Sequence, residues 1–543
     1  MSRLVRALVL PVVLFGPTSL PAQEHRHVDT GERLGRVRFP VSCSPEAQTR
    51  FEHAVAYLHS FWYEKATEAF PAVLQADSSC AMGHWGVAMS LLHPLWTPPP
   101  PSDLARGLAA AEQGLGLAKT TRERDYLMAI ATYYRDYTTA GPLSRLEAYA
   151  DAMGRVHERH PDDREAAIFY GLALIAVGQA HPTDTTFAHQ RRAHAILEPI
   201  FRGNPEHPGL AHYVIHATDY PPLARLGLFA ARRYAEIAPD VPHAQHMPSH
   251  IFTRAGMWQD VVGSNLRSAA AARRFEEAQS LAAMWDQTAH ALDYLAYAYL
   301  QEGRDVEANQ VSEEMARVTK VFPEHSLAAD YALAAVPARY ALERGRWDEA
   351  ARLPLRPAPA WRAAEAVTHF ARALGTARTG DTTTARAETD QLAAIEQALA
   401  AAGGPQTDWS RQVKIQRLAA SAWLASASGR VEDAVRLAAE AAALEDVTAK
   451  HPVTPGAVLP ARELQGDLLL ELGRPMDALA AYRASLAGAP NRARTLYGAA
   501  QAAEQGGDGK AAREYYAQFL GLMERGDAKR PEMDAAKRFL ATR

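Results

Sequence analysis

The chain has 543 residues, of which 48% are hydrophobic, and its 58 basic residues nearly balance its 62 acidic ones. This length and composition suffice to bury a large core. The balanced charge offers no basic patch that would neutralise phosphates, which argues against nucleic acid as a partner. Alanine is abundant and β-branched runs are rare, so the composition favours helix along almost the whole chain.

Residues 1–22 have the pattern of an export signal. Arg3 and Arg6 give a positive start, Ala7–Phe15 form an apolar run too short to span a bilayer, and small Ala22 precedes the expected cleavage. Three prolines in this segment disfavour a retained first helix. We predict a signal peptide and an exported protein, periplasmic or secreted. No later segment is apolar enough to span a membrane, so we expect no transmembrane segment in the mature chain.

Residues 23–45 are expected to form an irregular N-terminal segment. Cys43 and Cys80, the two cysteines of the sequence, lie about one repeat apart, each just before a predicted helix. Export makes a disulfide between them possible. Two buried free thiols fit the sequence equally well.

One turn pattern recurs from residue 300 onward, Gly-x-x-x-x-Ala flanked on both sides by apolar helical periodicity. Glycine lets the chain leave one helix through a left-handed turn. The small alanine lets the next helix pack closely on the first. The pattern is found at Gly303–Ala308, Gly345–Ala350, Gly380–Ala385, Gly429–Ala434, Gly473–Ala478 and Gly507–Ala512.

The last repeats are the most regular. Gly466, Gly473, Ala478, Tyr482 and Pro490 resemble the tetratricopeptide (TPR) consensus, and the pattern returns 34 residues later. The resemblance implies an all-α fold, a right-handed superhelical α-solenoid of TPR-like helix-turn-helix repeats. In such a solenoid the first helix of each pair lines a concave groove that holds a peptide or a partner protein. We expect a divergent TPR-like array with a histidine-rich block at 46–300, and a TPR array at 301–543.

The central block from His207 to Trp258 further resembles a subgroup of exported bacterial TPR proteins, through the segment His243–His250. This resemblance implies the fold and the location, and it implies no particular chemistry.

Two histidine pairs stand out in this block, His212 with His216 and His246 with His250. Each has the spacing His-x-x-x-His, which places both imidazoles on one helix face. The two pairs are 34 residues apart, the length of one TPR repeat. We therefore expect these four histidines at matching places on neighbouring helices.

Helical spacing extends this surface. A helix near 242–255 places its histidines beside the apolar stripe, and a helix near 289–302 offers further polar residues at matching spacing. Pro248 interrupts the first of these helices, either as a tolerated kink or as a bend that re-aims His250. The predicted groove residues are His212, His216, Asp219, His243, His246, His250, His290, Asp293 and Tyr297.

The histidines of this block suffice for a Zn²⁺, Cu²⁺, Ni²⁺ or Fe²⁺ site. The candidate ligands are His212, His216, His243, His246 and His250. Two alternatives stay open. The histidines could form a hydrogen-bonded ladder with Asp219, Tyr213 and Tyr220, or they could bind a peptide carboxylate.

The sequence contains no His-Glu-x-x-His, nucleophile elbow, phosphate loop or Cys-x-x-Cys. These absences favour a binding protein over an enzyme. The first hypothesis is an exported scaffold whose groove holds a peptide or an envelope protein. The second is a metalloprotein that binds a metal or uses it in hydrolysis or oxidation.

Overall fold

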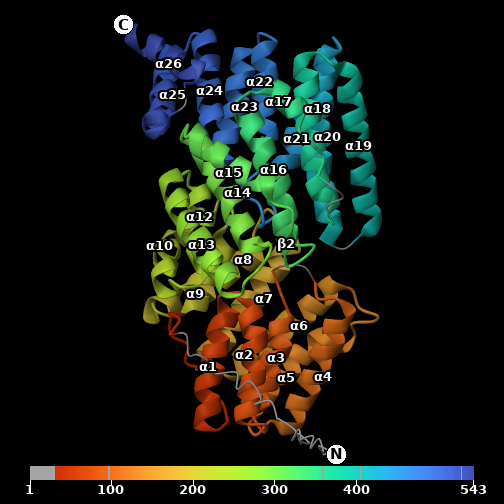
Figure 1. The fold of residues 1–543 in the computed structure, drawn as a ribbon, viewed down its shortest axis with the longest axis vertical. Coiled ribbons are helices and arrows are strands. Elements are labelled where there is room, and N and C mark those ends of the chain that lie inside the picture. Colours follow the sequence, from red (N-terminus) through yellow and green to blue (C-terminus); the bar gives the residue numbers. More distant parts are fainter. Residues whose placement is uncertain (1–30, 96–97, 357–359, 404, 528, 543) are drawn as a thin grey trace, which may run out of the picture. The chain divides into compact units, whose positions relative to one another are not determined.

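The computed structural model describes residues 31–95, 98–356, 360–403, 405–527 and 529–542, with the backbone alone for 405–408. The expected signal peptide at 1–22 lies outside the described residues. The chain divides into two units, Met1–Glu32 and Arg33–Arg543. Everything below concerns the second unit, whose elements are shown in Figure 1.

Helices begin at Pro45, after an extended stretch from Arg33. Ser44 caps the first helix by accepting a hydrogen bond from the Ala47 N–H. Cys43 and Cys80 form a disulfide, which settles the alternative that the sequence left open. The N-terminal helices are α1 (Pro45–His59), α2 (Tyr63–Ala76), α3 (Ala81–Leu91), α4 (Pro101–Leu117), α5 (Thr121–Arg135), α6 (Pro142–Arg159), α7 (Arg164–Gln179) and α8 (Ala188–Gly203).

The central helices contain the histidine-rich block. They are α9 (Pro208–Thr218), the short η1 (Ala224–Gly227), α10 (Leu228–Ile237), α11 (Pro242–His246), α12 (Pro248–Arg254), α13 (Trp258–Ala278) and α14 (Asp286–Gln301). Two short strands, β1 (Met284–Trp285) and β2 (Val321–Phe322), pair in parallel beside α14.

The C-terminal helices complete the chain. They are α15 (Asp305–Arg317), α16 (Leu327–Glu343), α17 (Trp347–Ala351), α18 (Arg362–Thr379), α19 (Thr382–Ala402), α20 (Pro405–Ala427), α21 (Val431–Asp446), α22 (Ala461–Glu471), α23 (Pro475–Gly488), α24 (Ala493–Gln505), α25 (Gly509–Leu522), η2 (Met523–Arg525) and α26 (Pro531–Ala541).

Each helix packs mainly on its neighbours in sequence, as the ordered change of colour in Figure 1 shows. The turn glycines have the left-handed backbone that was predicted for them. Their φ values are positive at Gly303, Gly345, Gly380, Gly429, Gly473 and Gly507. The fold is therefore the predicted all-α solenoid of TPR-like helix pairs. The boundary expected at residue 300 stays a prediction. Among the described residues no helix is both long enough and apolar enough to cross a bilayer.

One feature departs from a simple solenoid, in which each repeat contacts only its neighbours. The segment 447–460, between α21 and α22, returns to the central helices. Its Lys450 Nζ lies 3.1 Å from Asp219 Oδ2, and the Tyr294 hydroxyl donates to the Thr454 carbonyl at 3.2 Å. Helix α24 also packs on α14. The C-terminal repeats therefore cover part of the histidine-rich block.

Candidate metal centre

Four helices of the central part of the chain carry the histidines. Helix α9 carries His212 and His216, α11 and α12 carry the three histidines between 243 and 250, and α14 carries His290. Proline at the first position of α9 and of α11 fixes where each helix begins. All six side chains are buried, with exposed fractions between 0% and 6%.

The predicted helix near 242–255 is two helices. Helix α11 ends at His246 and α12 begins at Pro248, with Met247 between them. The expectation that the histidines flank the buried face was wrong. His243, His246 and His250 are as buried as Met247, because helices α13 and α14 and the segment 447–460 enclose them.

The first three histidines meet through their Nε2 atoms. The Nε2 atoms of His216 and His243 each lie 3.1 Å from Nε2 of His212. One ring nitrogen from each residue lies within 4.8 Å of those of the other two. We call this group the first triad.

The remaining three form the second triad, His246, His250 and His290. The Nε2 atoms of His246 and His250 are 3.0 Å apart, and the ring centroid of His290 lies 4.2 Å from that of His246. Ligand atoms of all three again lie within 4.8 Å of one another. The triads adjoin, because the ring centroids of His216 and His250 are 6.1 Å apart.

Partners at Nδ1 fix the tautomers of three of these rings. His212 Nδ1 lies 2.7 Å from the carbonyl oxygen of His59, which can only accept. His246 Nδ1 lies 2.6 Å from the amide oxygen of Asn265, and the Asn265 amide nitrogen donates to Val261 O. His212 and His246 therefore donate from Nδ1, so each neutral ring has a lone pair at Nε2.

His250 is fixed in the same way by a carboxylate. Its Nδ1 lies 2.8 Å from Asp219 Oδ2. Burial alone would raise the pKa of Asp219, but Lys450 and Arg254 hold that pKa well below its ordinary value. Asp219 is thus ionised and accepts the Nδ1 proton of His250, which leaves Nε2 of His250 with a lone pair.

Two nitrogen lone pairs therefore face each other across 3.0 Å in the second triad. The Tyr294 hydroxyl, 3.4 Å from His250 Nε2, donates to Thr454 instead. Two bare nitrogens this close in a buried site repel unless a cation lies between them. Two imidazole nitrogens bound to one ion at about 2.0–2.1 Å, with an angle near 95–110° between them, are about 3.0–3.4 Å apart. The observed separations of 3.0–3.1 Å fall in this range, which is also the range of an N–H···N hydrogen bond.

Burial keeps these rings in the form that binds metals. It lowers the pKa of His212, His216, His243, His246 and His290 well below the ordinary value of 6.5, and neighbouring histidines lower it further. Burial also lowers the pKa of His250, although Asp219 raises it. Neutral imidazole is the ligand form of histidine.

The other predicted groove residues have different partners. Asp293 accepts a hydrogen bond from Arg339 Nε at 3.1 Å, and the Tyr297 hydroxyl lies 2.8 Å from Arg492 Nη1. His290, which was predicted for the groove but not as a ligand, belongs to the second triad. Asp219 holds His250, as the ladder alternative also required. The Tyr213 hydroxyl lies 3.0 Å from His59 Nδ1, and its ring centroid lies 5.4 Å from that of His212. The Tyr220 hydroxyl accepts a hydrogen bond from Gln190.

A third cluster of histidines was not predicted. Glu165 lies between two imidazoles, 3.0 Å from His59 Nε2 and 2.9 Å from His207 Nε2. Nδ1 of His59 lies 3.0 Å from the Tyr213 hydroxyl, and Nδ1 of His207 accepts the Leu210 N–H. We call it the Glu165 cluster. Spacing along the chain does not predict this cluster, because Glu165 is 106 residues from His59.

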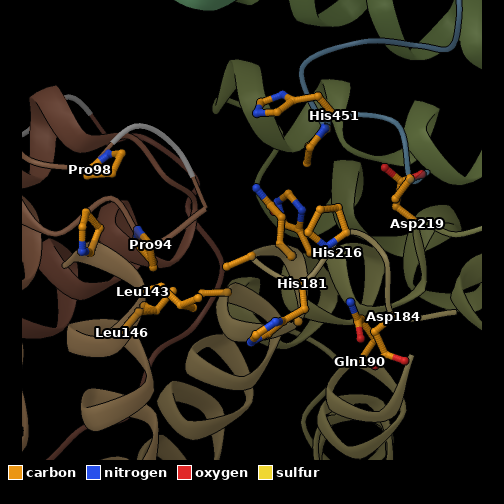
Figure 2. A pocket seen from close by; sticks show the side chains of 18 of the residues that line it. Pro94, Pro98, Leu143, Leu146, His181, Asp184, Gln190, His216, Asp219 and His451 are labelled. Atoms are coloured by element: carbon orange, nitrogen blue, oxygen red, sulfur yellow. The ribbon is translucent and has the colours of Figure 1, made fainter. Parts of the chain in front are cut away.

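A cavity of about 490 Å³ adjoins the first triad, and His216 forms part of its wall. Figure 2 shows Pro94, Leu143 and Leu146 on one side and His216 with Asp219 on the other. His451, from the returning segment, also lines it. Sequence reasoning missed this cavity, because its walls come from segments far apart in the chain.

No protein-family model matches the chain, and no curated protein sequence matches it. Among solved structures, a monomeric mutant of IFIT1 with Gppp-AAAA is 14% identical, with a TM-score of 0.38 over 81% of this chain and 90% of that chain. The APC/C hetero-tetramer Cut9–Hcn1 is 13% identical, with a TM-score of 0.28 over 92% of this chain and 97% of that chain. Naa15/Naa10 bound to HypK is 13% identical, with a TM-score of 0.21 over 91% of this chain and 72% of that chain. Likeness at this level does not bear on the chemistry of the site.

Proposed function

We propose that this protein is a metalloprotein whose two histidine triads bind transition-metal ions side by side. One observation carries the proposal. In the second triad the Nε2 lone pairs of His246 and His250 face each other at 3.0 Å, while Asn265 and Asp219 hold the protons on the opposite nitrogens. A metal cation between these atoms would resolve their repulsion.

The donor set indicates the class of metal. Each triad offers three neutral imidazoles and no thiolate, and the Asp219 carboxylate holds His250 rather than facing the Nε2 atoms. Imidazole suits zinc, copper, nickel and iron, and affinities in such sites rise toward copper. We therefore propose copper or zinc. Three protein ligands leave a coordination position open for a further molecule.

The proposed location is outside the cytoplasm. The basic and apolar start of the sequence supports export. The Cys43–Cys80 disulfide supports the same location, because disulfides persist in oxidising compartments.

The deciding experiment is elemental analysis of the untagged protein, expressed with its full sequence and exchanged into metal-free buffer. We expect copper or zinc in stoichiometric amount. The double variant His246→Ala, His250→Ala should lose the metal of the second triad, because it removes two of that triad's three ligands.

His207→Gln is the matched control. His207 is a buried histidine paired with a carboxylate, as His250 is, but its ring belongs to the Glu165 cluster. This variant should keep the wild-type metal content. Equal trace metal in the wild type and the double variant, after growth with added copper and zinc, would rule the proposal out.

A second candidate is peptide or envelope-protein binding, as the solenoid class suggests. A larger cavity of about 600 Å³ supports it, lined in part by the returning segment and by α20. Pull-down from an envelope extract tests this candidate. A Gln416→Trp variant, which narrows that cavity, should release a bound partner, and recovery of the same proteins by this variant counts against it.

A further inference from the structure

We infer that the cavity beside the first triad binds a small, uncharged aromatic molecule with a hydroxyl group, a phenol, next to the metal. This inference rests on the proposed function, because the open coordination position that would receive the phenol oxygen exists when a metal is bound.

The size of the cavity fits such a ligand. Its volume of about 490 Å³ is within the usual range for small-molecule sites, about 300–1,000 Å³. It is too small for a folded partner. It would enclose a single-ring molecule with one or two substituents.

Apolar surface makes up the larger part of the wall. Leucines and aromatic rings line it from helices α5, α6 and α20 and from residues next to the ends of α3 and α8, namely Leu92, Tyr133, Leu143, Leu146, Phe187 and Trp409. Flat rings and branched aliphatic groups favour an aromatic ligand, which gains by stacking as well as by burial.

The charges of the lining cancel, which favours an uncharged ligand. Lys450 is paired with Asp219 at 3.1 Å. Arg411 and Asp184 also line the cavity and have opposite signs. The Asp184 carboxylate already accepts hydrogen bonds from Thr186. The described part of the wall therefore has no net charge that would recognise an anion or a cation.

Two groups suit an oxygen on the ring. His216 belongs to both the first triad and the cavity wall, so a ligand in the cavity lies beside the metal site. His451 stacks on Trp409 at 4.8 Å, and its Nδ1 accepts the Val453 N–H. The proton of the neutral His451 ring is thus on Nε2, where it can be donated to a ligand oxygen.

Calorimetry on the zinc-loaded protein tests the inference, since zinc has no redox chemistry that would consume the probe. The probe is 4-methylphenol. We expect saturable binding, with toluene at least about tenfold weaker because it lacks the oxygen. Cyclohexanol should also bind more weakly, because it lacks the flat ring. Zinc-free protein should bind 4-methylphenol at least about tenfold more weakly than zinc-loaded protein.

Two leucine variants locate the binding. Leu143→Trp should narrow the cavity and weaken binding, and Leu143 is exposed enough, at 37%, for the change to leave the core intact. Leu226→Trp is the matched control, since Leu226 is 49% exposed and does not line the cavity. It should bind as the wild type does. His451→Ala should weaken binding about tenfold.

The zinc content of the same samples separates the two proposals. Stoichiometric zinc without phenol binding would overturn the inference and leave the proposed function standing. If the samples contain no zinc, the proposed function is overturned. The phenol oxygen would then have no metal to bind. Equal binding of toluene and 4-methylphenol, or unchanged binding in Leu143→Trp, would also overturn the inference.

Discussion

The protein contains two kinds of buried histidine cluster, and they differ in how protons and lone pairs are matched. In the Glu165 cluster every close contact joins a donor to an acceptor, since Glu165 accepts from His59 and His207. In the second triad two acceptor nitrogens face each other, those of His246 and His250. Both clusters hold three ligand atoms within 4.8 Å of one another. Proximity of histidines therefore does not separate the two clusters, and the facing lone pairs are the reason that we propose the second triad, and not the Glu165 cluster, as a metal site.

The Glu165 cluster is complete without a metal, and it supports the triads from outside. Burial alone would raise the pKa of Glu165, but His207 and His59 hold it at about 2. Glu165 is therefore ionised at neutral pH and accepts both imidazole protons. The carbonyl oxygen of His59, at the end of α1, accepts the Nδ1 proton of His212. One cluster thus fixes a helix end that orients a ligand of the other.

Metal removal should have the largest effect. A bound metal stabilises the folded state by about 4 kcal/mol at a free concentration of 1,000 times Kd. Treatment with a chelator should remove that stabilisation and leave the facing lone pairs of the second triad uncompensated. Urea denaturation before and after treatment measures the loss.

Added zinc should restore the stability of the wild type. The His246→Ala, His250→Ala variant should respond less to both treatments, because it keeps the first triad alone. If complete removal of the metal leaves the free energy of unfolding unchanged, the triads do not need a metal. They would then be stable without one, as the Glu165 cluster is.

Glu165→Gln should have the next largest effect, and its size should depend on pH. The folded pKa of about 2 is below the ordinary value of 4.5, so the ionised carboxylate stabilises the fold fully above pH 4.5. That stabilisation, about 3 kcal/mol at 1.36 kcal/mol per pKa unit, is lost as the pH falls through 2. Denaturation at pH 7, 5 and 3.5 measures the free energy of unfolding of the wild type and the variant. The difference between the two should become smaller only at pH 3.5.

The same variant should keep its metal, because the Glu165 cluster is complete without one. Loss of metal in Glu165→Gln with little loss of stability would mean that this cluster is a third metal site. If the variant loses the same free energy of unfolding at all three pH values, the loss comes from packing and not from the charge of Glu165.

Asp219→Asn should weaken the second triad without unfolding the protein. Loss of the carboxylate that holds a ligating histidine costs about tenfold to a hundredfold in metal affinity. Asp293→Asn is the matched control, because Asp293 is also a buried, ion-paired carboxylate, and its partner is Arg339. Competition with a chromophoric chelator measures both affinities. Equal affinity in Asp219→Asn and in the wild type would remove Asp219 from the metal centre.

The sequence predicted those parts of the site that follow from helix and repeat periodicity. The spacing His-x-x-x-His and the 34-residue interval placed His212, His216, His246 and His250 on neighbouring helices, where the structure has them. His290 was placed on the surface but not among the ligands, because it follows His246 by 44 residues rather than 34. Longer helices and turns between α12 and α14 absorb the difference.

Contacts between distant segments could not be predicted in this way. A solenoid pattern predicts that a repeat contacts its neighbours, so it gives no sign that Lys450 reaches Asp219 over 231 residues. Asp293 and Tyr297 have the correct spacing for the groove, yet arginines of the C-terminal helices pair with them. Spacing decides which residues share a face, and the partners of that face come from the tertiary fold.

The smallest effect is expected at Asn265, which orients a single ring of the second triad. Its amide oxygen accepts the Nδ1 proton of His246 at 2.6 Å, and its amide nitrogen is anchored on Val261 O at 2.8 Å. Asn265→Ala frees His246 to turn or to carry its proton on Nε2. His246 Nε2 could then donate to His250 Nε2, and the two lone pairs would no longer face each other. Metal affinity should fall about tenfold. The metal-free protein should lose less stability than a buried Asn→Ala change usually costs, because the facing lone pairs disappear. Unchanged affinity with an ordinary stability loss would show that Asn265 serves packing alone, and the second triad would then resemble the Glu165 cluster.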